Sequence, residues 1–159
     1  AAGGFEGLPP LDDAHLGSLL AREAGVVRRL SDLPVDAVLA ALVPPALSRA
    51  LDRFAPPRFD TPAGTSHAID YAAEGGPEVG VRVQALFGLA RHPEAGGRPL
   101  TLALTSPAGR VIQKTRDLPA FWRGSWAEVR KELRGRYPKH DWPEDPTTAQ
   151  PTTRAKPRA

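Results

Sequence analysis

The sequence predicts an α+β domain: short N-terminal helices, an antiparallel sheet of two β-hairpins, a tryptophan-bearing helix on that sheet and an extended proline-rich C-terminal segment. Three observations lead to this prediction. Apolar residues recur at helical spacing before residue 55, two Pro-Ala-Gly turns separate short extended segments in the middle, and all three tryptophans fall between residues 116 and 146. A chain of 159 residues has room for one principal core.

The first 55 residues are predicted to form three short helices. The first begins at Asp12 or Asp13, residue types that accept a bond from free amides at a helix start, and ends at Gly25. Ser31 opens the second helix. Pro-Pro pairs at residues 44–45 and 56–57 end the second and third helices, because proline lacks the backbone donor that a helix interior needs.

Two β-hairpins are predicted in the middle of the chain, at residues 58–71 and 100–115. Each is centred on Pro-Ala-Gly, in which proline suits the first central position of a turn and glycine a later one. Residues 100–105 alternate between leucine and smaller side chains, as expected for a strand with two distinct faces. Val111 and Ile112 are adjacent, so the last strand is expected to be buried on both faces.

The segment Val79 to Leu89 fits two patterns. Val79, Val81 and Val83 have strand period, whereas Val79, Val83 and Leu86 have helix spacing. We expect a helix from about residue 80 to 88, ended by Gly88.

The tryptophan-bearing helix is the most clearly patterned element. Asp117 is expected to cap a short first turn, and Ser125 with Glu128 is expected to form a capping box at the restart. A stripe that must be buried runs along the helix at positions i, i+4, i+7 and i+11, and Gly135 is the expected stop. The stripe consists of Trp122, Trp126, Val129 and Leu133.

Basic residues gather in the C-terminal quarter. Residues 1–122 carry 12 Lys/Arg against 13 Asp/Glu, whereas residues 123–159 carry 9 against 5. Such a patch suits an acidic partner, because guanidinium and ammonium groups bind phosphate oxygens and aromatic faces can stack bases. The candidate nucleic-acid-binding residues are Arg123, Arg130, Lys131, Arg134, Arg136, Lys139, Tyr137 and Trp142.

Ordinary structural roles remain open for the same residues. Glu128 can pair with Lys131, and Glu132 with Arg136, which would make a solvated helix surface. Trp142, between Asp141 and Pro143, can pin the C-terminal segment onto its own domain instead of stacking a base.

The chain offers little for catalysis. It has no phosphate-cradling G-x-x-x-x-G-K-[ST] loop, no G-x-S-x-G elbow and no cysteine. Its four histidines lie far apart without ligand-like spacing, so no catalytic residue, cofactor site or metal ligand is predicted. The absence of cysteine and of a long apolar run predicts a cytoplasmic protein without membrane contact.

The organisation predicted is a helical connecting segment at residues 1–55, an α+β domain at 56–146 and a disordered basic tail at 147–159. The chain contains no methionine and opens with Ala-Ala-Gly-Gly, which indicates a piece of a longer polypeptide.

The run KTRDLPAFWRGSWAEVRKELRGRYPKHDWPEDP resembles the C-terminal signature of the HrpB-type bacterial DEAH-box ATP-dependent RNA helicases. The resemblance extends over residues 51–159 and includes LDRFAPPRFDTPAGTSHAIDY, VRVQALFGL, GGRPLTLALTSPAGRVIQKTRDL and PTTRAKPRA. Residues 1–50 fit it loosely. No motor motif of the family occurs in this chain, so no catalytic residue carries over.

The resemblance implies two RecA-like motor domains upstream in the same polypeptide, which would bind ATP and Mg²⁺. This chain would then be a non-catalytic accessory domain that contacts single-stranded RNA through its basic helix. On that reading, charge reversal at Arg130 and Arg134 is expected to abolish RNA binding and leave the fold intact. The alternative is a structural clamp, in which the basic stripe and residues 137–146 dock on the motor domains without touching RNA.

Overall fold

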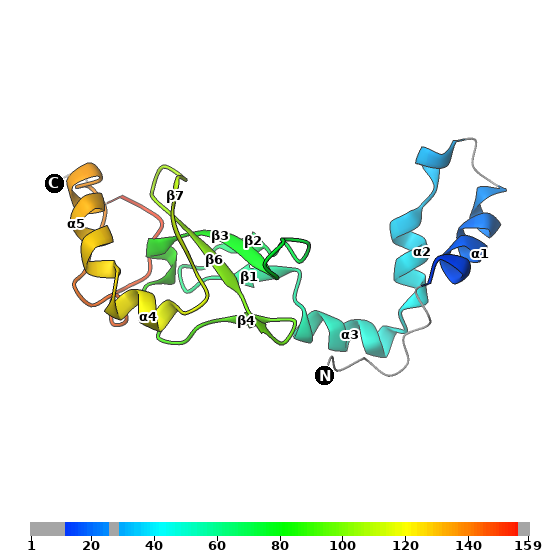
Figure 1. Ribbon diagram of the computed structural model, residues 1–159, viewed down its shortest axis with the longest axis horizontal. Helices are drawn as coiled ribbons and strands as arrows, with labels where there is room; N and C mark the ends of the chain where they lie inside the picture. Colours follow the sequence, from blue (N-terminus) through cyan, green and yellow to red (C-terminus); the bar gives the residue numbers. More distant parts are fainter. Residues whose placement is uncertain (1–11, 26–28, 156–159) are drawn as a thin grey trace. The chain divides into compact units, whose positions relative to one another are not determined.

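The computed structural model describes residues 12–25 and 29–155 (Figure 1). The chain forms two compact units, residues 1–53 and 54–159, and each is considered by itself. The predicted division into a connecting segment, an α+β domain and a tail, with boundaries at residues 55 and 146, stays a prediction.

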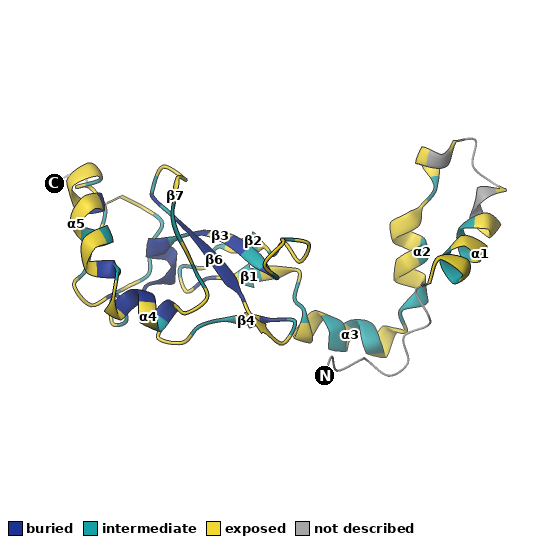
Figure 2. Ribbon diagram, in the orientation of Figure 1, coloured by how far each residue is buried: buried dark blue, intermediate teal, exposed yellow. Residues whose placement is uncertain are grey.

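The first unit is helical, as predicted. It contains α1 (Asp13–Ala24), a single 3-10 turn η1 (Leu30–Asp32), α2 (Val35–Leu42) and α3 (Pro45–Phe54), which runs into the second unit. The Asp12 carboxylate caps α1 by accepting from the His15 N–H at 2.7 Å. Neither α2 nor α3 contains a buried residue, and Figure 2 shows α2 largely exposed. Within the described residues, the apolar side chains of α2 and α3 are therefore at most partly buried.

The second unit begins with the first predicted hairpin. Strands β1 (Arg58–Asp60) and β2 (Ser66–Ala68) pair antiparallel, with Phe59 opposite His67. Gly64 has a φ of +77° in the turn, a conformation that glycine adopts without steric cost. The hairpin is confirmed, although it forms a two-stranded sheet of its own.

The larger sheet is mixed rather than purely antiparallel. It has the order β3 (Glu78–Arg82), β6 (Thr101–Thr105) and β7 (Val111–Thr115), where β6 and β7 are the second predicted hairpin. Strand β3 pairs parallel to β6, with Val79 opposite Leu102. Parallel strands need a long crossover connection. The connection between β3 and β6 contains the small hairpin of β4 (Glu94–Ala95) and β5 (Arg98–Pro99). The α+β class is confirmed, but the two long hairpins do not share one sheet.

The predicted helix at residues 80–88 is wrong. The strand pattern prevails in β3, where Val79 and Val81 are each 1% exposed and Gly80 faces outward. The chain then tightens into a 3-10 turn, η2 (Val83–Leu86), whose residues are all buried. Hydrogen bonding to β6 makes this segment a strand rather than a helix. The local spacing of apolar residues carries no information about a partner so far along the chain.

Burial along the second long hairpin is the reverse of the prediction. Strand β6 is central and is buried on both faces through most of its length, whereas β7 is an edge strand with Val111 52% exposed. The adjacent apolar pair Val111-Ile112 thus marks an edge beside a bulge rather than a doubly buried strand.

The core lies between the three-stranded sheet and two C-terminal helices, α4 (Leu118–Arg123) and α5 (Trp126–Arg136) (Figures 1 and 2). The predicted stripe is confirmed, with Trp122, Trp126 and Leu133 buried and Val129 packed against them. The prediction of a capping box is wrong, because the Ser125 side chain makes no hydrogen bond that caps α5. Helix α5 continues through the expected stop at Gly135 to Arg136.

A candidate nucleic-acid interface beside the C-terminal helix

Two side chains hold the start of α4. The Asp117 carboxylate accepts from the Ala120 N–H at 2.9 Å, so the predicted cap is confirmed. The Nδ1 atom of His92 accepts from the Leu118 N–H at 3.1 Å, which requires a neutral ring with its proton on Nε2. Nε2 has no hydrogen-bond partner within the described part of the chain. His92 therefore acts here as a neutral acceptor for a helix-end amide, a role that the sequence did not indicate.

Burial lowers the pKa of His92 below its ordinary value of about 6.5, and this effect outweighs the Leu100 backbone, Asp117 and Glu94, which raise it. Below pH 6.5 the unfolded state binds more protons than the folded state, so the free energy of unfolding is expected to fall as pH drops toward the folded pKa. His92→Asn keeps an acceptor near the Nδ1 position and cannot be protonated, so a weaker pH dependence is expected in urea unfolding between pH 5 and 8. An unchanged pH dependence would contradict the assignment.

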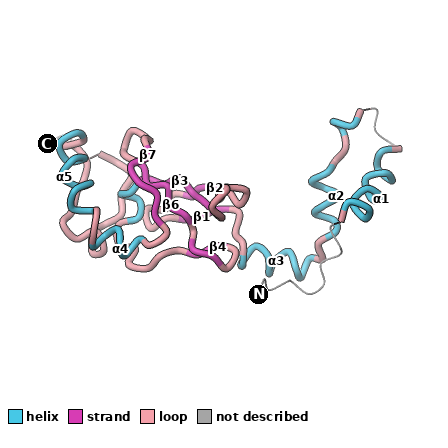
Figure 3. The backbone as a smooth tube through the Cα atoms, viewed as in Figure 1, coloured by secondary structure: helices cyan, strands magenta, loops and turns pink. Residues whose placement is uncertain are grey.

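The segment after α5, residues 137–146, is called the strap here. Figure 3 draws it as a loop that turns back after α5. The Trp142 indole N–H donates to the Tyr137 carbonyl at 2.9 Å, and the Trp126 indole N–H donates to the Pro143 carbonyl at 3.1 Å. The Trp142 ring is 6% exposed and lies 6.2 Å from that of Trp126. Trp142 thus packs on its own domain, which favours the pinning role over base stacking.

Arg130 belongs to the same arrangement. Its Nε–H donates to the Trp142 carbonyl at 2.8 Å, and its guanidinium contacts the Glu144 carboxylate at 3.1 Å. The side chain is only 24% exposed. Arg130 therefore binds the strap to α5, and its donors are largely used within the domain. The link spans 12 residues, beyond the spacings that helix patterns indicate.

The chain beyond the strap also returns to the domain. The Gly88 N–H donates to the Pro146 carbonyl at 2.8 Å, and the Thr152 N–H donates to the Gln84 carbonyl at 3.1 Å. Arg82 donates to the Thr153 carbonyl at 3.1 Å. The part of the predicted disordered tail up to residue 155 is thus placed against η2 and β3, whereas residues 156–159 lie outside the described residues.

The remaining candidate cations lie on the surface. Arg136 pairs with Glu132 at 3.5 Å, as predicted, and keeps about half of its side chain exposed. In the described part of the chain, the ion pairs include neither the predicted Glu128–Lys131 pair nor any of four exposed cations. These four are Arg123, Lys131, Arg134 and Lys139.

A hollow of about 350 Å³ is lined by residues of both α5 and the strap. It is lined by Arg130, Arg134, Pro138, His140, Asp141 and Trp142. Burial, and to a lesser degree the charge of Arg82, lowers the pKa of His140, so this ring is mostly neutral at pH 7. The positive charge of the rim therefore comes from Arg134, from the neighbouring Lys139 and from Arg130, which pairs with Glu144, while Asp141 contributes a negative charge.

No group of three or more His, Asp or Glu side chains that could hold a metal ion is found in residues 12–25 and 29–155. The sequence has no G-x-x-x-x-G-K-[ST] loop for nucleotide phosphates, and the resemblance implied ATP and Mg²⁺ only for motor domains outside this chain. Over the described residues, no helix combines the length and apolar character needed to cross a bilayer.

Comparisons with known proteins agree with the resemblance seen in the sequence. A family model described as "ATP-dependent helicase C-terminal" matches residues 17–146, so the similarity includes much of the helical first unit as well. The ATP-dependent RNA helicase HrpB of Escherichia coli K12 is 42% identical over an alignment of 157 positions, and the match covers 93% of this chain.

Solved structures give the same result. A crystal structure of the E. coli DExH-box NTPase HrpB covers 90% of this chain, with a TM-score of 0.81 and 39% sequence identity. A crystal structure of the E. coli DEAH/RHA helicase HrpB covers 84% of this chain, with a TM-score of 0.64 and 37% sequence identity. The chain spans 18–19% of the length of these relatives. It therefore belongs to the family of C-terminal domains of HrpB-type ATP-dependent helicases.

Proposed function

We propose that this chain is a non-catalytic accessory domain of an ATP-dependent RNA helicase and that it contacts single-stranded RNA through the exposed cations of α5 and the strap. The observation that carries the proposal is the pair Lys131 and Arg134, which lie one helical turn apart, are exposed, and form no ion pair within the described residues. Motor domains outside this chain would bind ATP and Mg²⁺ and move along the nucleic acid.

The spacing of these cations suits a phosphate backbone. Lys131 and Arg134 lie on one face of α5 at i and i+3, and Lys139 and Arg123 lie beyond the two ends of that helix. Each phosphate that such a group neutralises releases counterions, which strengthens binding at low salt. The buried Trp142 and the neutral His140 add little to this surface, so the proposed contact is chiefly electrostatic.

The geometry gives less support to a clamp formed by the strap. A clamp needs free aromatic side chains to place against a motor domain, whereas Trp142 is already buried against α5 and its N–H is already used. The basic stripe could still dock on an acidic protein surface, and the binding experiment separates that role from RNA contact.

The test is fluorescence anisotropy of the 159-residue chain with a labelled single-stranded RNA over a series of salt concentrations. Four phosphate contacts are expected to give a log–log slope of about −3, at about −0.7 per contact. Lys131→Glu with Arg134→Glu is expected to weaken binding at least about tenfold and to flatten the slope by roughly 1.4, because two contacts are lost.

Charge reversal at a distant site is the matched control. Arg98→Glu changes an exposed arginine in the β4–β5 hairpin and is expected to affect binding only slightly. Absence of RNA binding by the parent chain at low salt would reject the proposal and leave docking on a protein partner. Equal losses in Arg98→Glu and in the single variant Arg134→Glu would reject α5 as the binding surface.

A further inference from the structure

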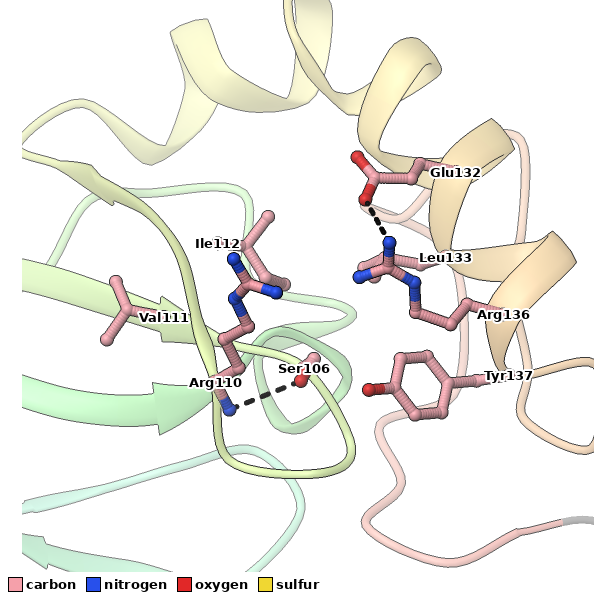
Figure 4. A pocket seen from close by; sticks show the side chains of 8 residues that line it. All are labelled: Ser106, Arg110, Val111, Ile112, Glu132, Leu133, Arg136 and Tyr137. Carbon is pink, nitrogen blue, oxygen red and sulfur yellow. Dashed lines mark hydrogen bonds and ion pairs between the residues drawn. The ribbon is translucent and has the colours of Figure 1, made fainter.

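A second hollow lies where the turn between β6 and β7 faces the last turn of α5 (Figure 4). Its volume is about 190 Å³. Figure 4 shows the side chains of Arg110 and Arg136 reaching into the same space from these two elements, with the Tyr137 hydroxyl directed toward the turn. Two cationic side chains from separate parts of the fold thus line one small hollow.

The polar groups of this hollow are mainly hydrogen-bond donors without an acceptor. In the described structure, the Arg110 guanidinium and the Tyr137 hydroxyl form no hydrogen bond or ion pair. The Ser106 hydroxyl accepts from the Arg110 backbone N–H at 3.3 Å, which leaves its own proton available to donate. Donors that converge without an acceptor suit a ligand that supplies oxygen acceptors.

The charge balance points the same way. Glu132 is the single carboxylate among the lining residues, and it lies 3.5 Å from the Arg136 guanidinium. The C-terminal end of a helix carries partial negative charge, which by itself repels an anion. The two arginines and one glutamate in the lining give the hollow a net side-chain charge of +1. Glu132 offsets the charge of Arg136, and the charge of Arg110 is not offset.

We infer that this hollow binds a phosphate group, with Arg110 and Arg136 contacting its oxygens and the Tyr137 and Ser106 hydroxyls donating to it. This rests on the proposed function in one respect: the source of the phosphate is the backbone of the single-stranded RNA that follows the exposed face of α5. A hollow of about 190 Å³ has room for a phosphate group together with ordered water molecules.

RNA affinity measured across a salt series, with the 159-residue chain and side-chain variants, tests the inference. Arg110→Gln is expected to weaken binding several-fold and to flatten the log–log slope by about 0.7, the loss of one phosphate contact. Tyr137→Phe is expected to weaken binding less, with little change of slope, because only an uncharged donor is removed. Arg98→Gln, the control for loss of one exposed charge, is expected to bind as the parent does.

A second measurement identifies the occupant. Amide NMR shifts of the chain are followed on addition of an oligouridylate, and separately of inorganic phosphate against sodium chloride at equal ionic strength. Shifts at residues 106–111 and 133–137 are expected with both phosphate-containing probes.

The outcomes distinguish the two proposals. RNA binding by the parent that is unaffected by Arg110→Gln, without shifts at residues 106–111, would overturn the inference and leave the proposed function standing. Shifts with inorganic phosphate but no binding of RNA would overturn both the RNA source and the proposed function. Arg110→Gln removes no side-chain hydrogen bond or ion pair of the described structure, so an unchanged melting temperature is expected to accompany its loss of affinity.

Discussion

Replacing Trp126 by alanine is expected to destabilise the second unit by about 3–5 kcal/mol, the cost typical of a large aromatic removed from a core. The side chain is 1% exposed, and its ring lies 5.6 Å from Phe87 and 5.4 Å from Trp122 in edge-on arrangements. Its N–H also donates to the Pro143 carbonyl, so the substitution removes one of the contacts that tie the strap to the helix. Small domains have only about 5–15 kcal/mol of stability, so much of it would be lost.

Thermal unfolding followed by circular dichroism measures this effect. A fall of the melting temperature by about 12–40 °C is expected, at about 4–8 °C per kcal/mol for a domain of this size. Val111→Ala, at an exposed edge position, is the control and is expected to shift the melting temperature by only a few degrees. A Trp126→Ala variant that melts with the parent would show that this cluster is not the centre of the core.

The tryptophan cluster was predictable because its signal is local. Apolar residues at i, i+4, i+7 and i+11 mark one face of a helix wherever that helix lies, and the structure buries Trp122, Trp126 and Leu133 as expected. The Asp117 cap and the two hairpin turns depend on neighbouring residues in the same way.

Strand β3 was not predictable from its own residues. Val79, Val81 and Val83 fit a strand, yet Val79, Val83 and Leu86 fit a helix equally well. The choice is made by pairing with β6, about 20 residues further along the chain. A parallel partner supplies the hydrogen bonds that the segment would otherwise make within a helix, and no local pattern carries that information.

In the candidate site, too, features with a local sequence signal were predictable and features that depend on distant contacts were not. Helical spacing correctly placed Lys131 and Arg134 on the exposed face of α5. It also assigned Arg130 to phosphate binding, because periodicity cannot foresee that a proline-rich segment folds back over that residue. The hollow at Arg110 was not predicted for a related reason. Its lining comes from the β6–β7 turn and from α5, and the Pro-Ala-Gly pattern of that turn predicts a hairpin but not which helix lies beside it.

Replacing Arg130 by alanine is expected to destabilise the domain by about 1.5–3 kcal/mol, so charge reversal at this position is expected to affect the fold as well as RNA binding. The substitution removes a charge-assisted bond at 2.8 Å and leaves the Trp142 carbonyl without that donor. The ion pair with Glu144 contributes little, because that carboxylate side chain is 86% exposed. Urea unfolding measures the loss, and a red-shifted tryptophan emission before unfolding would report that Trp142 has become exposed.

Arg134→Ala is the matched comparison, since it removes the same side chain one turn further along α5. Arg134 is exposed and forms no ion pair in the described region, so its loss is expected to change stability by less than about 0.5 kcal/mol. It should lower RNA affinity, whereas Glu144→Gln should alter neither property strongly. Equal stability losses at the two arginines would contradict the separation between a residue that holds the strap and one that faces a ligand. The opposite pattern, with stability lost only at Arg130, would mean that neighbouring cations of one helix serve different purposes because the strap covers only one of them.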